Sequence, residues 1–111
     1  MANEPEAPLP LKGGLDPLLT SELRFYIVTV LAMYKMVDFN FLKQQLDATD
    51  GNLSANLTKL EEAGYLTVKK EFVGKKTRST YTVTAEGLAK LSAHLDTMEA
   101  VKTRLNQETR S

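Results

Sequence analysis

The sequence contains no cysteine, and this absence excludes several kinds of site at once. Without thiols the chain has no disulfides, no cysteine nucleophile and none of the cysteine ligands that most structural zinc sites use. Histidine is almost as scarce, because His94 is the only one and a single imidazole cannot build a His-rich metal site. We therefore expect no metal site, and the composition suits a reducing compartment.

The sequence also lacks any apolar run long enough to cross a bilayer, which takes about 20 residues. Residues 1–10 carry Glu4 and Glu6 but neither a basic start nor an apolar segment, so they do not resemble a secretory signal. An apolar fraction of 42% and a charged fraction of 25% are ordinary for a globular protein, and 111 residues suit one domain with a modest core. We expect a soluble, cytoplasmic protein with no membrane partner.

An excess of either charge is missing too, since 14 basic and 14 acidic residues give a formal net charge of zero. A neutral chain is not typical of proteins that bind nucleic acid, because phosphate contacts need Lys and Arg. The charges are nevertheless unevenly placed. Between Lys69 and Arg78 the chain carries two lysine pairs and the arginine against Glu71 alone, which makes this stretch its most basic part.

No pattern typical of a catalytic site is present. His94 and Asp96 are two residues apart, a spacing that places their side chains on different faces of a helix. The sequence has no glycine-rich elbow around a nucleophile and no phosphate-cradling loop. We therefore expect a protein that is not an enzyme and uses no cofactor.

Residues 1–14 are rich in Pro and Gly and contain acidic but no aromatic residues, so we expect a disordered N-terminal tail. The fold should begin near Leu15, and Asp16 followed by Pro17 is typical of a helix start. Apolar residues at helical spacing then predict a first helix of about four turns, with a second candidate cap at Thr20 or Ser21. Its expected core face holds Leu23, Ile27, Val30, Leu31 and Tyr34.

Two further helices follow, separated by only a few residues. Asp38 can cap the second, and Thr49 or Asp50 can cap the third, which should cover about residues 50–63 and end at Gly64. The inner positions of these two helices are Leu42, Leu46, Leu53, Leu57 and Leu60.

After the third helix the pattern changes from helical to alternating, over Tyr65 to Val73 and then Thr80 to Thr84. Residues 74–79 between them read Gly-Lys-Lys-Thr-Arg-Ser, so we expect a β-hairpin with a basic tip. Thr84 can then cap a last helix from Ala85 to about Leu105, whose apolar seam consists of Leu88, Leu91, Leu95, Met98 and Leu105. The seam could pack back on its own domain, but it continues past the length needed to cover so small a core, which favours dimerisation.

The order helix, helix, helix, hairpin, helix is typical of a winged helix-turn-helix, a mainly α fold with a small β-hairpin wing. If the leucines of the third helix face the core, a rotation of 100° per residue places a polar set on its outer side. This set consists of Asn52, Ala55, Thr58, Lys59 and Glu62, with Ser54 and Asn56 flanking it. Such side chains suit base edges in a major groove about 12 Å wide, while the hairpin supplies most of the positive charge.

Residues 50–66 and 81–87, with the basic hairpin between them, resemble the small prokaryotic winged-helix transcriptional regulators of the MarR and ArsR kind. The two segments read Asp-Gly-Asn-Leu-Ser-Ala-Asn-Leu-Thr-Lys-Leu-Glu-Glu-Ala-Gly-Tyr-Leu and Tyr-Thr-Val-Thr-Ala-Glu-Gly, and the likeness runs from about Leu15 to Leu105. The resemblance implies a homodimer joined by terminal helices, with the third helix in the major groove of double-stranded DNA and the wings beside the minor groove or backbone. The chain departs from the family at Ala55, near which such regulators often carry an Arg.

The resemblance implies groove contact at Asn52, Ser54, Ala55, Asn56 and Lys59, and backbone contact from the wing, about residues 73–80, at Lys75, Lys76 and Arg78. The DNA-binding domain would span residues 15–105, including a C-terminal dimerisation helix, and residues 106–111 would be a flexible C-terminus. Simpler roles remain open, since the polar helix face could be only solvated and the hairpin lysines could keep an edge strand soluble.

Two other functions fit the same pattern. A winged helix can serve as a protein-protein interaction module without reading DNA, and a pI near 6.6 with Glu61 and Glu62 on the third helix favours that alternative. A small-molecule effector could also bind between the first helix and the dimer helix, where Phe25, Tyr26 and Tyr34 could line a pocket. The sequence names no such ligand.

Overall fold

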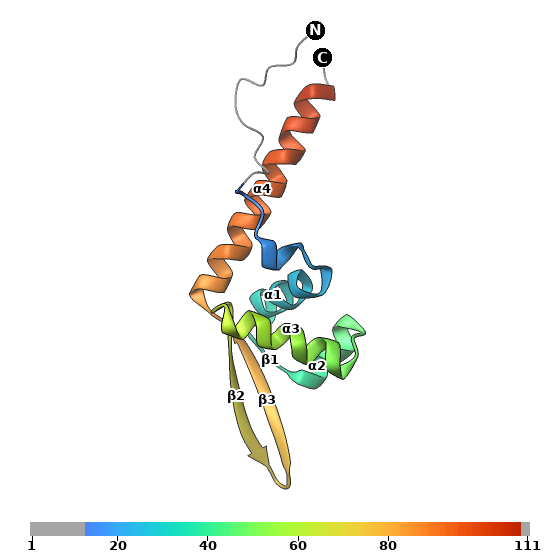
Figure 1. Ribbon diagram of the computed structural model, residues 1–111, viewed down its shortest axis with the longest axis vertical. Helices are drawn as coiled ribbons and strands as arrows, with labels where there is room; N and C mark the ends of the chain where they lie inside the picture. The colour runs from blue at the N-terminus through green and yellow to red at the C-terminus, as the bar shows by residue number, and fades with distance from the viewer. Residues whose placement is uncertain (1–12, 110–111) are drawn as a thin grey trace.

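The computed structural model describes residues 13–109. Most of the expected N-terminal tail, residues 1–12, and the end of the expected flexible C-terminus, residues 110–111, lie outside the described residues. Gly13 and Gly14 form a turn, and the Thr97 hydroxyl donates to the Gly14 carbonyl at 2.9 Å. The element order is η1 (Pro17–Thr20), α1 (Glu22–Tyr34), β1 (Met36–Asp38), α2 (Phe39–Leu46), α3 (Asp50–Glu62), β2 (Leu66–Val73), β3 (Lys76–Val83) and α4 (Ala85–Thr109) (Figure 1).

Side-chain caps start η1 and the first three α-helices at positions that the sequence marked. The Asp16 carboxylate accepts from the second residue of η1, after which Ser21 caps α1. Asp38 caps α2, and Thr49 rather than Asp50 caps α3. Each such cap stabilises its helix by about 1 kcal/mol, because it satisfies an N–H group that has no partner within the helix.

The core lies where α1, α2 and α3 meet the sheet. The expected stripe of α3, Leu53, Leu57 and Leu60, is buried, and so is Leu42 of α2. The expected core position of Tyr34 is wrong, because this side chain is 57% exposed. Tyr34 is the last residue of α1, where the chain turns away, and its ring packs edge-on against Phe41 at 5.1 Å. Ile27 and Leu31 are fully buried as expected, and so is Val28, which the prediction did not include.

The three strands form an antiparallel sheet in the order β1-β3-β2. The sequence analysis missed β1, because three residues are too few to show alternation. It also predicted too long a hairpin tip over residues 74–79. Val73 pairs with Lys76, so only Gly74 and Lys75 form the turn. Gly74 has a φ of 67°, which suits the first position of a two-residue hairpin turn and which residues with a Cβ adopt at a cost.

The start of α4 is fastened to the end of α3. The Thr84 hydroxyl donates to the Gly64 carbonyl at 2.6 Å and accepts from the Gly87 N–H at 2.9 Å, so Thr84 caps α4 as expected. The Thr84 N–H in turn donates to the Tyr65 carbonyl at 3.0 Å. From this junction α4 runs to Thr109, beyond its expected end near Leu105, and its second half projects away from the other helices, opposite the wing (Figure 1).

Candidate nucleic-acid interface

The outer face of α3 is exposed at four of the five residues expected to contact a groove: Asn52, Ser54, Ala55 and Lys59. They face solvent because the leucine stripe of the same helix is buried against α1 and α2. Thr58 is exposed on this face too, whereas the exposed acids Glu61 and Glu62 occupy its last turn. The groups suited to base edges therefore lie in the first three turns of the helix.

The fifth residue, Asn56, is only partly exposed because Arg24 of α1 lies against it. Arg24 Nη1 donates to Asn56 Oδ1 at 2.8 Å, and Arg24 Nε donates to the Leu18 carbonyl at 2.8 Å. Asn56 Nδ2 then donates to the backbone carbonyl of Asn52 at 2.8 Å and to Asn52 Oδ1 at 3.1 Å. These bonds join α1 to the exposed face of α3.

Arg24 is a polar residue that the sequence analysis did not single out, because α1 was examined only for its apolar face. Its place in the sequence, three residues before the core residue Ile27, gave no sign of a contact with Asn56 of α3, which lies 32 residues further along the chain. Arg24 thus brings a guanidinium from α1 to the side of α3 that carries Asn56.

The wing is formed by β2, β3 and their tight turn, and it projects from the core (Figure 1). Each strand of eight residues is about 26 Å long, and only the end of the hairpin opposite its turn is buried in the core. Lys75 lies in the turn and Lys76 begins β3, and both are exposed. In the part of the chain that the structure describes, neither lysine forms an ion pair. Phe72, which the sequence analysis did not single out, is 82% exposed beside them and gives the basic tip an apolar side.

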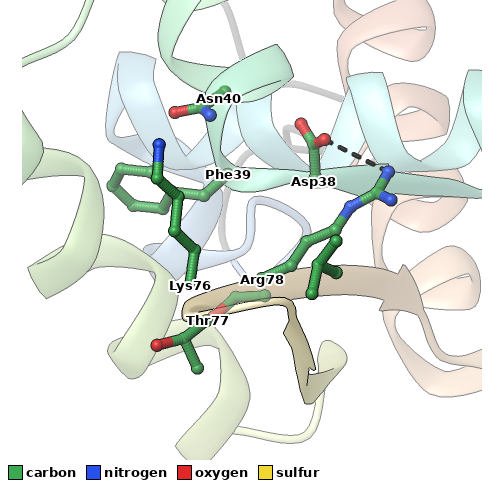
Figure 2. A pocket seen from close by; sticks show the side chains of 8 residues that line it. Asp38, Phe39, Asn40, Lys76, Thr77 and Arg78 are labelled. Carbon is green, nitrogen blue, oxygen red and sulfur yellow. Dashed lines mark hydrogen bonds and ion pairs between the residues drawn. The ribbon is translucent and has the colours of Figure 1, made fainter.

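Arg78, the third cation expected on the wing, faces back toward α2. Figure 2 shows its guanidinium directed at Asp38, with Nη2 3.3 Å from Oδ2. The other oxygen of this carboxylate caps α2 through the Phe41 N–H at 2.8 Å. Lys76 points toward the start of α2 and lines, with Asp38 and Arg78, an open groove of about 400 Å³. Arg78 therefore joins the wing to α2, whereas Lys75 and Lys76 form no ion pair within residues 13–109.

The expected apolar seam of α4 divides into two parts. Leu91 is 4% exposed and packs in the core of its own domain. The other four members are exposed: Leu88, Leu95, Met98 and Leu105. Within one chain, this row of four side chains on α4 thus remains accessible to solvent.

Asp16 holds the middle of α4 against the rest of the domain. Its backbone N–H donates to Nδ1 of the buried His94 at 2.9 Å, and its Oδ2 accepts from the Tyr65 hydroxyl. Burial, this hydrogen bond and the negative charge of Asp16 together raise the pKa of Tyr65 well above its ordinary value near 10. The only histidine of the chain is therefore part of the packing between α4 and the N-terminal segment.

Of the three aromatic residues expected to line an effector site, Phe25 and Tyr26 lie together, whereas Tyr34 lies apart from them. Phe25 lies 5.8 Å from His94 and 6.2 Å from Tyr26, measured between ring centroids. Tyr34 lies at the other end of α1, against Phe41 of α2. Within residues 13–109, no helix is long and apolar enough to span a membrane, and no three His, Asp or Glu side chains are grouped as metal ligands.

Comparison with known proteins agrees with this geometry. The winged helix DNA-binding domain family matches residues 23–101. An uncharacterized protein of Methanocaldococcus jannaschii, MJ0432, is 34% identical over 70 residues, which cover 63% of this chain and 76% of that protein. A transcriptional regulator homologue from Pyrococcus horikoshii OT3 has a similar structure, with a TM-score of 0.78 and 25% identity over 86% of this chain and 96% of that one. NadR in complex with 4-hydroxyphenylacetate shares the fold, with a TM-score of 0.59 and 22% identity over 96% of this chain and 83% of that one.

The chain therefore belongs to the winged helix DNA-binding domain family, and its structural neighbours are MarR-like transcriptional regulators, as the sequence resemblance implied.

Proposed function

We propose that this protein is a sequence-specific regulator of transcription that binds double-stranded DNA as a homodimer, with α3 in the major groove and the wing on the backbone or in the minor groove. The observation that carries the proposal is the pairing of an exposed polar face on α3 with a wing tip whose two lysines have no ion-pair partner within residues 13–109. A DNA partner would place the protein in the compartment that holds the chromosome, which in a prokaryote is the cytoplasm.

The side chains of the α3 face divide the work of recognition between them. Asn52, Ser54 and Lys59 bond to base edges, and Ala55 is small enough to sit against a thymine methyl group. Lys75 and Lys76 of the wing neutralise phosphates, which strengthens binding to any sequence and makes it sensitive to salt. In this proposal the wing lysines mainly set the affinity for DNA, and the side chains of α3 mainly set which sequence is bound.

A second copy of the chain covers the exposed row on α4 in this proposal. A helix of 25 residues is about 38 Å long, and the distal half of α4 projects away from the other helices (Figure 1). Pairing Leu88, Leu95, Met98 and Leu105 with the same residues of another chain removes their apolar surface from water. The pair then presents two α3 helices to half-sites about 34 Å apart, one turn of the DNA helix.

The test is a titration of the purified protein with a random pool of duplex DNA at two salt concentrations, followed by sequencing of the bound fraction. We expect a palindromic motif and steep salt dependence. Lys75→Ala combined with Lys76→Ala should flatten the slope of log K against log salt by up to about 3.6, since a dimer loses four phosphate contacts at about 0.9 each. The matched control is Lys35→Ala with Lys90→Ala, which removes the same charge from exposed positions outside α3, the wing and the exposed row of α4 and should leave the slope unchanged.

Absence of both enrichment and salt-sensitive binding would contradict the proposal and favour the protein-protein interaction module. Equal slopes for the two lysine variants would remove the wing from the DNA interface while leaving α3 in it.

A small-molecule effector site beside α1 is a lesser part of the proposal. Phe25 and Tyr26 form a ring pair next to α4, and Tyr26 is 44% exposed. NadR, which shares this fold, is known in complex with an aromatic acid. We expect 4-hydroxyphenylacetate, used as a probe, to raise the melting temperature of the wild type but not of Tyr26→Ala, and equal behaviour of the two proteins would exclude this site for aromatic acids.

A further inference from the structure

We propose that Arg24 fixes the orientation of the Asn52 amide, so that Asn52 presents its NH2 group and not its oxygen to the major groove. The inference rests on the proposed function, because it assumes that α3 reads base edges. In this proposal Arg24, a residue of α1, helps to determine which base the protein selects, although it need not touch DNA itself.

The orientation follows from the donors and acceptors along the contact. A guanidinium only donates hydrogen bonds, so the atom of Asn56 that lies 2.8 Å from Arg24 Nη1 must be the amide oxygen. The other end of the Asn56 amide is then its NH2 group, which lies 3.1 Å from the side chain of Asn52. An NH2 group also only donates, so the Asn52 atom that receives this bond must be its oxygen. The Asn52 nitrogen is therefore directed away from Asn56.

Arg24 is itself held in place by a hydrogen bond, so it can fix the orientation of the two amides. Its Nε donates to the Leu18 carbonyl at 2.8 Å, and the Leu18 N–H donates to the Asp16 carboxylate at 3.0 Å. Because the guanidinium is planar, the bond at Nε also fixes the direction of Nη1. Asn56 is secured at its other end by the Asn52 backbone carbonyl at 2.8 Å. Turning the Asn56 amide over would break bonds at both of its ends, and turning the Asn52 amide over would place its NH2 group against the NH2 group of Asn56.

The consequence for recognition is a preference between base edges. In the major groove the acceptor atoms are guanine O6 and N7, thymine O4 and adenine N7, whereas cytosine N4 and adenine N6 are donors. The usual bidentate contact of Asn with adenine uses both the oxygen and the NH2 group. In this protein the Asn52 oxygen already accepts from Asn56 and is directed toward it, so it is poorly placed to accept from adenine N6 as well. The exposed NH2 group therefore favours the bases whose major-groove edge offers acceptors without a neighbouring donor, guanine and thymine, at the position that Asn52 contacts.

The decisive variant is Asn56→Asp, tested by selection from a random pool of duplex DNA. The introduced carboxylate still accepts from Arg24 but has no hydrogen to donate to Asn52, so the Asn52 amide should turn its NH2 group inward and its oxygen toward the groove. We expect the wild type to select guanine or thymine at one position of each half-site and Asn56→Asp to select adenine or cytosine there, a change of about tenfold in relative affinity. Asn52→Ala should lose the preference at that position alone, and this identifies the position.

Arg24→Met supplies a second measurement. Without the guanidinium both amides can turn over, so discrimination at the Asn52 position should fall to within about twofold while the salt slope stays at the wild-type value. Circular dichroism establishes that each variant is folded at the temperature of the selection.

Retention of the wild-type base by Asn56→Asp would overturn the inference. So would a loss of affinity in Arg24→Met that is equal for all sequences and accompanied by a flatter salt slope, because Arg24 would then be a phosphate contact. Failure of the proposed function has a different signature, since the wild type itself would select no motif, and the inference would fall with it.

Discussion

Replacing Gly87 by alanine tests how closely α4 must approach the end of α3. A Cβ at this position would overlap the carbonyl oxygen of Tyr65 and lie 2.9 Å from both its carbonyl carbon and its Cα. These neighbours are backbone atoms, which cannot move aside as the end of a flexible side chain can. The Tyr65 carbonyl also accepts from the Thr84 N–H at 3.0 Å, so a shift of either segment weakens this bond. Gly87 is thus required by close packing within a helix.

The magnitude follows from two opposing effects. In an open helix, Gly→Ala stabilises by about 1 kcal/mol because alanine has the higher helix propensity. Overpacking against a fixed backbone costs about 1–3 kcal/mol, and the loss of a buried backbone hydrogen bond adds about 1 kcal/mol more. We therefore expect Gly87→Ala to lower the free energy of unfolding by about 2 kcal/mol and the melting temperature by about 10 °C.

Gly51→Ala is the matched control, because Gly51 is also helical and a Cβ there meets nothing within 4 Å. It should raise the free energy of unfolding by about 0.5–1 kcal/mol. Urea unfolding followed by circular dichroism measures both variants, at one protein concentration so that any association affects them equally. A Gly87→Ala protein as stable as the wild type would refute the close contact between α4 and Tyr65.

The remaining predictions concern self-association and alkaline pH. Leu95→Glu combined with Met98→Glu should give a folded monomer in sedimentation, because both side chains are exposed in one chain and their removal spares the core. The control, Ser92→Glu combined with Ala100→Glu, should stay dimeric. Equal masses for the two variants would contradict dimerisation through the exposed row of α4. Tyr65 and Tyr81 both have raised pKa values in the folded protein, mainly through burial, so above pH of about 10 the unfolded chain releases protons that the folded chain retains. The contribution of these tyrosines to the free energy of unfolding should therefore be constant below that pH and fall above it, by at most about 1.4 kcal/mol per pH unit for each tyrosine. Tyr65→Phe should remove one such share of the alkaline slope, and an unchanged slope in the variant would contradict the assignment.

Much of the fold could be predicted because its signals are local. Asp38 and Thr49 are caps whose side chains act within three residues, and the stripe of α3 repeats at the helical period. The strand Met36–Asp38 could not be predicted, since it exists only because β3 offers it a partner far along the chain. The tip of the hairpin was misjudged for a similar reason, because its polar sequence resembles a loop although its backbone is paired up to Val73 and Lys76.

The candidate site was harder to predict than the fold because polar side chains were assigned one at a time. Rotation about the helix axis placed Asn56 beside the outer face but could not show its bond to Arg24. Position in the wing grouped Arg78 with the two lysines, whereas its contact is with Asp38. In both cases a partner more than 30 residues away decides whether a side chain is free on the surface or bonded to another element of the fold.

The same long-range contacts link the proposed dimer helix to the proposed reading helix. Thr84 ties the first turn of α4 to Gly64, two residues after the end of α3. Further along α4, His94 accepts from the Asp16 N–H, and the Asp16 carboxylate accepts from the Leu18 N–H. The Leu18 carbonyl then accepts from Arg24, which holds Asn56 on α3. Because α3 is attached to α4 both at its end and along its side, the two helices should move as one body. In a dimer joined through α4, the distance between the two α3 helices is therefore set by how the α4 helices pack, and substitutions in their exposed row that preserve dimerisation but alter its angle should change the preferred spacing of half-sites.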